Sequence, residues 1–210
     1  MGMKLLKVVF VVLLCCGGSA QAVPITIQIS GNVTYTNGSG LPGTIHVGDT
    51  FTGNYTYDSS TDVSGNGHHY YDTPYGISLS LGGYEFKTAP NHVGQFDMLI
   101  INDGFGGGGI TDYYTVFSDK NIFGTSVGPT NDWIGWLRWD LWDSSHTALS
   151  SDALPVTAPV LTAWNHNVLE IYGYGFGSLS IIKGTVTQVT PEPLTGVLMA
   201  IGVFFLRHKR

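Results

Sequence analysis

Two histidines and an aspartate lie close together in the segment His68-His69-Tyr70-Tyr71-Asp72. Imidazole and carboxylate groups are common ligands of transition metals, so this segment is a candidate metal site. Adjacent residues of an extended chain point in opposite directions, however, and two neighbouring histidines therefore rarely bind one ion. We predict that these are exposed polar loop residues, and we expect no metal and no other cofactor.

A glycine-rich run follows Asp103, with the sequence Gly-Phe-Gly-Gly-Gly-Gly. A phosphate-binding loop would continue with Lys and Ser or Thr and would open a helix, and neither feature is present here. The regular aspartate spacing of a calcium-binding loop is also missing. The run at 103–109 is therefore predicted to be a flexible hairpin loop.

No spacing in the sequence defines a catalytic group. The chain has no G-x-S-x-G sequence, and its two cysteines, Cys15 and Cys16, both lie in the N-terminal apolar segment. We therefore predict that the protein is not an enzyme. A secreted glycan-active enzyme is the least favoured alternative, because it would need two carboxylates facing each other across a cleft.

Four tryptophans occur within the ten residues 133–142. In a strand, Leu137, Trp139 and Leu141 would face one way, and these residues are predicted to be core. Trp136, Arg138, Asp140 and Trp142 would face the other way. Their rings and polar groups could bind sugar rings and hydroxyls, so a carbohydrate-binding module is the alternative function. The simpler expectation is that a neighbouring loop covers both rings.

The elements that must position these residues are predicted to be strands. The sequence has 29 glycines and almost no helical periodicity, and apolar residues alternate with polar ones in many short segments. We predict an all-β fold, an antiparallel β-sandwich or jelly roll of eight or nine strands, with long surface loops at 58–73 and 144–163. The expected strands lie at 25–29, 51–57, 77–81, 98–101, 113–118, 133–142, 168–174 and 179–189.

The N-terminal residues 1–22 differ from the domain that follows. Lys4 and Lys7 precede a nine-residue apolar stretch, and the segment ends in Ala20-Gln21-Ala22. This is the pattern of a secretory signal peptide with cleavage after Ala22. The exported domain is therefore expected at 23–189. Residues 23–190 carry four Lys or Arg against fourteen Asp or Glu, a net charge of about −10, which argues against nucleic acid as a partner.

The C-terminal residues 190–210 also stand apart. Pro191-Glu192-Pro193 is followed by the apolar run 194–206 and then by the basic residues Arg207, Lys209 and Arg210. The thirteen apolar residues would form a helix about 20 Å long, whereas the hydrocarbon core of a bilayer is about 30 Å thick. The run is thus predicted to be a short transmembrane helix, with the basic end held in the cytoplasm.

This three-part order, together with the N-terminal signal, resembles the PEP-CTERM sorting signal. The resemblance implies that the chain is a substrate of exosortase, an integral-membrane cysteine transpeptidase of Gram-negative bacteria that make extracellular polysaccharide. It implies transient anchoring in the inner membrane and a final place on the cell surface or in the extracellular matrix, where exopolysaccharide is a further candidate partner. His208, which interrupts the basic end, and the short apolar run depart from the pattern.

The exported domain is also similar to domains found upstream of such tails. Four segments carry the similarity: Gly48–Gly53, Tyr55–Asp58, Ser151–Pro155 and Ile182–Val186. The resemblance implies an all-β domain and transfers no catalytic residue. We further expect the strand around Gly31-Asn32-Val33 to lie beside the strand around Gly184-Thr185-Val186.

Overall fold

The computed structural model describes residues 24–38, 45–64, 66–91, 93–106, 109–125, 128–175 and 178–192. These residues form ten β-strands and one short 3-10 turn, η1. The elements are β1 (Pro24–Asn37), β2 (Thr50–Asp58), β3 (His68–Tyr71), β4 (Gly76–Leu81), β5 (Tyr84–Thr88), β6 (Phe96–Gly106), β7 (Gly109–Thr125), β8 (Gly128–Asp143), η1 (Leu161–Ala163), β9 (His166–Gly175) and β10 (Ser178–Pro191).

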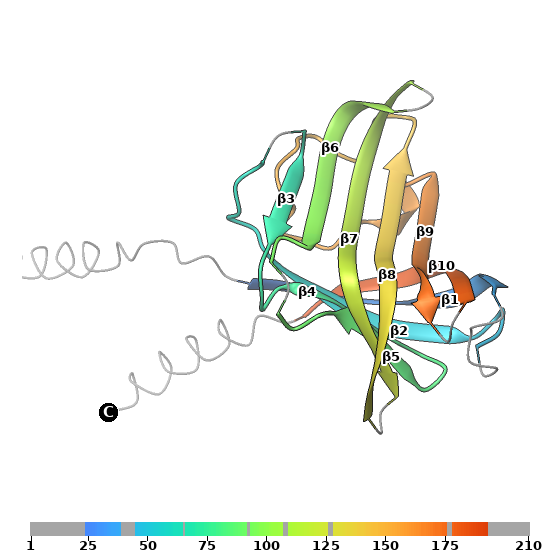
Figure 1. The fold of residues 1–210 in the computed structure, drawn as a ribbon. Helices are drawn as coiled ribbons and strands as arrows, with labels where there is room; N and C mark the ends of the chain where they lie inside the picture. The colour runs from blue at the N-terminus through green and yellow to red at the C-terminus, as the bar shows by residue number, and fades with distance from the viewer. Residues whose placement is uncertain are drawn as a thin grey trace, which may run out of the picture.

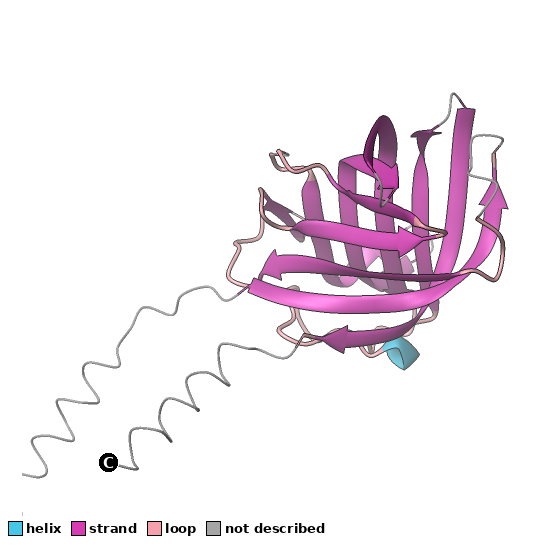
Figure 2. Ribbon diagram, turned by 90° about the horizontal axis from the view of Figure 1, so that it is seen from below, coloured by secondary structure: helices cyan, strands magenta, loops and turns pink. Residues whose placement is uncertain are grey.

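All ten strands belong to one antiparallel sheet, in the order β3-β6-β7-β5-β4-β2-β1-β10-β9-β8. The long strand β7 also pairs with β8, the last strand in this order, so the sheet curls back on itself, while β6 and β3 continue from β7 to the other end of the sheet. Strands β6 to β9 run upright in Figure 1, and β1, β2 and β10 run across them. Figure 2 shows the two directions from below. The all-β antiparallel prediction is confirmed, but the strands form one continuous sheet instead of two separate ones.

The core lies inside the curl, where every second residue of each strand points. In β8, Leu137, Trp139 and Leu141 are 0% exposed, as the alternation predicted. Tyr55 of β2 and Tyr114 of β7 meet in this core, and their hydroxyl oxygens are 2.6 Å apart. This hydrogen bond joins strands from the two directions of the sheet.

The first and last strands are neighbours, as we expected. Gly31 pairs with Val186, and Val33 pairs with Gly184. The ring of Phe51 packs over both glycines, because a Cβ atom at Gly31 or at Gly184 would lie 2.6 Å from it. Glycine is therefore needed at both positions for the ring to approach the backbone.

Two strands were not predicted, and both are short. β5 follows β4 through a tight turn at Gly82 and Gly83, which both have positive φ. β3 lies in the segment 58–73, which was wrongly expected to be a surface loop throughout. The hairpin at the glycine run is confirmed, since β6 and β7 pair as far as Gly106 and Gly109. Residues 144–163 form the connection between β8 and β9, as predicted, and contain no strand.

Candidate functional site

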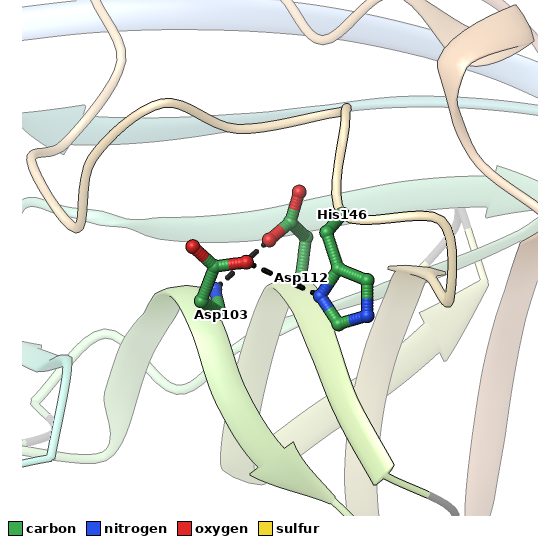
Figure 3. Close-up of side chains that lie close together, drawn as sticks. All are labelled: Asp103, Asp112 and His146. Atoms are coloured by element: carbon green, nitrogen blue, oxygen red, sulfur yellow. Dashed lines mark hydrogen bonds and ion pairs between the residues drawn. The ribbon is translucent and has the colours of Figure 1, made fainter.

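Three side chains of the types that can ligate a metal ion meet at one end of the sheet, as Figure 3 shows. Asp103 comes from a bulge in β6, Asp112 from β7, and His146 from the β8–β9 connection. One ligand atom from each residue lies within 4.8 Å of the other two. The backbone of Asp103 and His146 has positive φ, at 56° and 58°, a conformation that is uncommon for residues other than glycine. No spacing in the sequence links these three positions.

The carboxylate of Asp112 is 0% exposed and is already occupied by backbone donors. Its Oδ1 accepts the N–H of Asp103 at 3.0 Å. Its Oδ2 accepts the N–H groups of Ala148 and Leu149 at 3.1 and 2.9 Å. A buried carboxylate is stable when several hydrogen bonds replace its hydration, so these contacts account for the burial of Asp112 without a metal ion.

A second buried aspartate, Asp143, pairs with Asp112 across β7 and β8 and is also 0% exposed. It accepts hydrogen bonds from the backbone and the hydroxyl of both Ser145 and Thr147, at distances from 2.7 to 3.2 Å. Burial alone would raise the pKa of Asp143, but these hydrogen bonds outweigh it and lower the pKa to about 2. The two aspartates therefore hold the β8–β9 connection against the end of the sheet.

The histidine segment is a strand, and the prediction of exposed loop residues is wrong for His69, which is 2% exposed. The two imidazoles point to opposite sides, as expected. His68 Nδ1 lies 2.6 Å from Oδ2 of Asp97, and His69 Nδ1 lies 3.0 Å from the carbonyl oxygen of Thr61. Burial raises the pKa of Asp97 in spite of the neighbouring His68. Asp72 instead accepts the N–H of Gly94.

Trp136, Arg138, Asp140 and Trp142 share the outward face of β8, as predicted from the alternation. The ring of Trp136 stacks on Tyr172 of β9 with 3.9 Å between the ring centres, and Trp142 stacks on His166 at 4.7 Å. One face of each indole is therefore covered by a ring on the neighbouring strand, not by a loop. Trp142 remains 36% exposed.

Charged groups between these rings are paired with one another. Arg138 Nε lies 2.7 Å from Oδ2 of Asp140, and Lys183 Nζ lies 2.9 Å from Oε2 of Glu170. Burial raises the pKa of Asp140 despite Arg138. Burial would also raise the pKa of Glu170, but hydrogen bonds from Lys183 and Trp136 outweigh this effect and lower the pKa of Glu170. The face thus carries paired carboxylates and no free acid–base pair among the described residues of β8 and β9.

The C-terminal motif begins within the described chain. Pro191 pairs with Ile27 at the end of β10. Glu192 donates its N–H to the carbonyl of Thr26 at 2.9 Å and accepts a hydrogen bond from the side-chain amide of Gln28 at 3.1 Å. Ala22, Pro193, Arg207, Lys209 and Arg210 lie outside the described residues, as do the predicted signal peptide at 1–22 and the predicted helix at 194–206. Within the described ranges, no helix has the length and apolar character needed to cross a membrane.

No protein-family model, curated protein or solved structure matches this chain. The function must therefore be inferred from its own residues.

Proposed function

We propose that this chain is an exported protein without catalytic activity, sorted and processed through its C-terminal residues 190–210. The N-terminal signal peptide would be cut after Ala22, and an exosortase-type transpeptidase would recognise Pro191, Glu192 and Pro193. The short apolar helix and the basic end, Arg207, Lys209 and Arg210, would hold the chain in the inner membrane until processing. The β domain would then reside on the cell surface or in the exopolysaccharide matrix.

The position of the motif is the observation that carries this proposal. Pro191 is the last residue of β10 and Glu192 follows it directly, and both are exposed at the surface of the domain. Proline fixes φ near −65° and favours an extended chain in the residue before it. An extended, exposed segment at the border of a folded domain is accessible to a transpeptidase that binds its substrate as a strand.

The chemistry of the buried acids supports the non-catalytic part of the proposal. The carboxylates of Asp112 and Asp143 accept backbone and hydroxyl hydrogen bonds that tie down a loop. A general base needs a lone pair directed at a substrate proton. These two groups direct their oxygens at the protein itself, so they are suited to a structural role.

The experiment compares processing of the wild-type chain with that of a Pro191→Ala/Glu192→Ala variant, in a Gram-negative host that has an exosortase-type enzyme. We expect the variant to accumulate at the molecular mass of the anchored form, while the wild-type protein is shortened. Lys183→Ala, on the same strand but outside the motif, is the matched control and should be processed normally. Equal processing of all three proteins would contradict the proposal.

Carbohydrate binding is the second candidate function, and the exposure of Trp142 favours it. Trp142 is 36% exposed and lies on the same face as Arg138 and Asp140, and among the described residues only His166 stacks on its ring. An aromatic face next to polar groups is suited to a sugar ring. Trp142→Ala should then abolish retention of the full chain on a polysaccharide column, and unchanged retention would exclude this surface.

A further inference from the structure

A separate hollow lies on the outward face of the other part of the sheet, where β10, β1, β2, β4 and β5 are neighbours. Its volume is about 840 Å³, within the range of about 300–1,000 Å³ that is typical of ligand sites. Gln188 and Thr190 lie at one end, and Tyr84 and Glu85 lie at the other. The hollow is therefore a groove that crosses the strands.

The register of the strands arranges polar side chains in rows along this groove. Gln188 of β10 pairs with Ser30 of β1, Ser30 with Thr52 of β2, and Thr52 with Ser80 of β4. A second row, which includes Asn54, lies two residues further along each strand. Neighbouring strands are about 4.8 Å apart, so each row places a hydroxyl or amide group at that interval. The result is a regular array of groups that can both donate and accept hydrogen bonds.

Several of these side chains have no hydrogen-bond partner among the described residues, although Gln28 donates to Glu192 and Ser78 donates to Glu85. Among the described residues, the side chains of Thr52, Asn54, Ser80 and Gln188 make no hydrogen bond, and Thr52, Asn54, Ser80 and Gln188 are all exposed. The polar residues on the face of β8 differ in this respect, because they pair with one another. The groove thus has free hydrogen-bonding capacity over several strands.

The charge of the groove restricts the class of ligand. Among the described residues that line it, Glu85 is the only charged one, and its carboxylate is 2.9 Å from Nζ of Lys87. The net charge of about −10 over residues 23–190 would repel a polyanion. An uncharged polymer is not repelled by this net charge. Its many hydroxyl groups can donate and accept hydrogen bonds along both rows of side chains.

We propose that this groove binds a neutral polysaccharide chain, which lies across the strands from β10 to β5. The groove spans five neighbouring strands, and this length suits several sugar units in place of one. This inference goes beyond the proposed function and does not depend on it, because a groove of this kind binds glycan whether or not the tail is processed.

Affinity electrophoresis of the full chain in native gels tests the proposal. The gels contain hydroxyethylcellulose, dextran or galactomannan as neutral probes, and alginate as an anionic probe. We expect at least one neutral polymer to retard the protein, and alginate not to do so. Thr52→Ala/Asn54→Ala removes two groups from the groove and should weaken binding about tenfold. Asn54→Trp fills the groove and should abolish retardation.

Two controls make the result specific to the groove. Asn91→Ala/Thr162→Ala removes the same types of group from exposed positions outside the groove and should bind as the wild type does. Thermal unfolding by circular dichroism verifies that each variant is folded. The proposal is overturned if no neutral polymer retards the protein, if the folded Thr52→Ala/Asn54→Ala variant is retarded as strongly as the wild type, or if only Trp142→Ala loses retardation.

Discussion

Asp112 and Asp143 show how single carboxylates stabilise a long connection in this protein. Both are buried at the end of the β7–β8 pair, and both accept hydrogen bonds from the connection between β8 and β9. A connection of this length, 144–165, would otherwise have few contacts that order its backbone. The hydrogen bonds that each aspartate accepts therefore stabilise the fold and do not depend on a ligand.

Replacement of Asp143 by Asn should make stability less dependent on pH. The pKa of Asp143 is lowered from 3.8 to about 2 in the folded protein, so its contribution is complete above pH 4 and is lost as the pH falls through about 2. The wild type should exceed Asp143→Asn in its free energy of unfolding at pH 6, and the difference should shrink at pH 2.5. Urea titrations at both values measure this.

Asp62→Asn is the control for this measurement, because Asp62 is exposed and its side chain makes no hydrogen bond within the described residues. Its stability should follow that of the wild type at both pH values. A difference between the wild type and Asp143→Asn that is the same at pH 6 and at pH 2.5 would contradict the role given to the Asp143 carboxylate.

Strands from the two directions of the sheet are joined in the core by the hydroxyls of Tyr55 and Tyr114. These residues are 0% and 1% exposed, and burial raises the pKa of both phenols well above 10. Both therefore remain neutral hydrogen-bonding groups at any ordinary pH. The bond fixes β2 against β7 at a point where the strands are not neighbours in the sheet.

Removal of both hydroxyls should cost less than the sum of the two single removals. Tyr114→Phe leaves the Tyr55 hydroxyl buried without that partner, which costs about 1–3 kcal/mol. Tyr55→Phe/Tyr114→Phe removes the unpaired group as well, and its loss of stability should be smaller than the sum of the two single losses. Urea unfolding of the four proteins completes the cycle, and strictly additive losses would exclude the pairing.

Most of the strands could be predicted from the sequence, because the alternation of polar and apolar residues along a strand is a local property. The core positions of β8 and the outward position of Trp136 follow directly from a period of two. β3 was missed because His68 and His69 make a polar segment, and pairing with β6 overrides that composition. The cluster of Asp103, Asp112 and His146 was missed because it depends on a bulge and on a loop returning from β8, which no spacing reveals.

The whole molecule is closed by two contacts, between β7 and β8 and between β1 and β10. The second of these was expected from resemblance, and the structure confirms it, whereas the curl of a single sheet was not foreseen. Sheet curvature follows from bulges and glycines acting together, and these are hard to weigh in a sequence with 29 glycines. The polar groove appears only at this scale, because its rows require the register of several strands.

Closure at β1 and β10 should be sensitive to a single methyl group. A Cβ atom at Gly184 would lie 2.6 Å from the Phe51 ring and 2.9 Å from the carbonyl oxygen of Asn32. Gly184→Ala should therefore lower the free energy of unfolding by about 1–3 kcal/mol. Thr185→Ala, at the next position, should have a smaller effect. Thermal and urea unfolding would contradict this packing if the two variants were equally stable.

The central claim is that the chain is exported and then shortened near Pro191-Glu192-Pro193. The most direct test is the intact mass of the mature protein, purified from the surface fraction of a Gram-negative host that has an exosortase-type enzyme. We predict a protein that begins at Val23 and lacks the basic end at Arg207, Lys209 and Arg210. A mature protein whose mass shows that it still ends at Arg210 would contradict the claim.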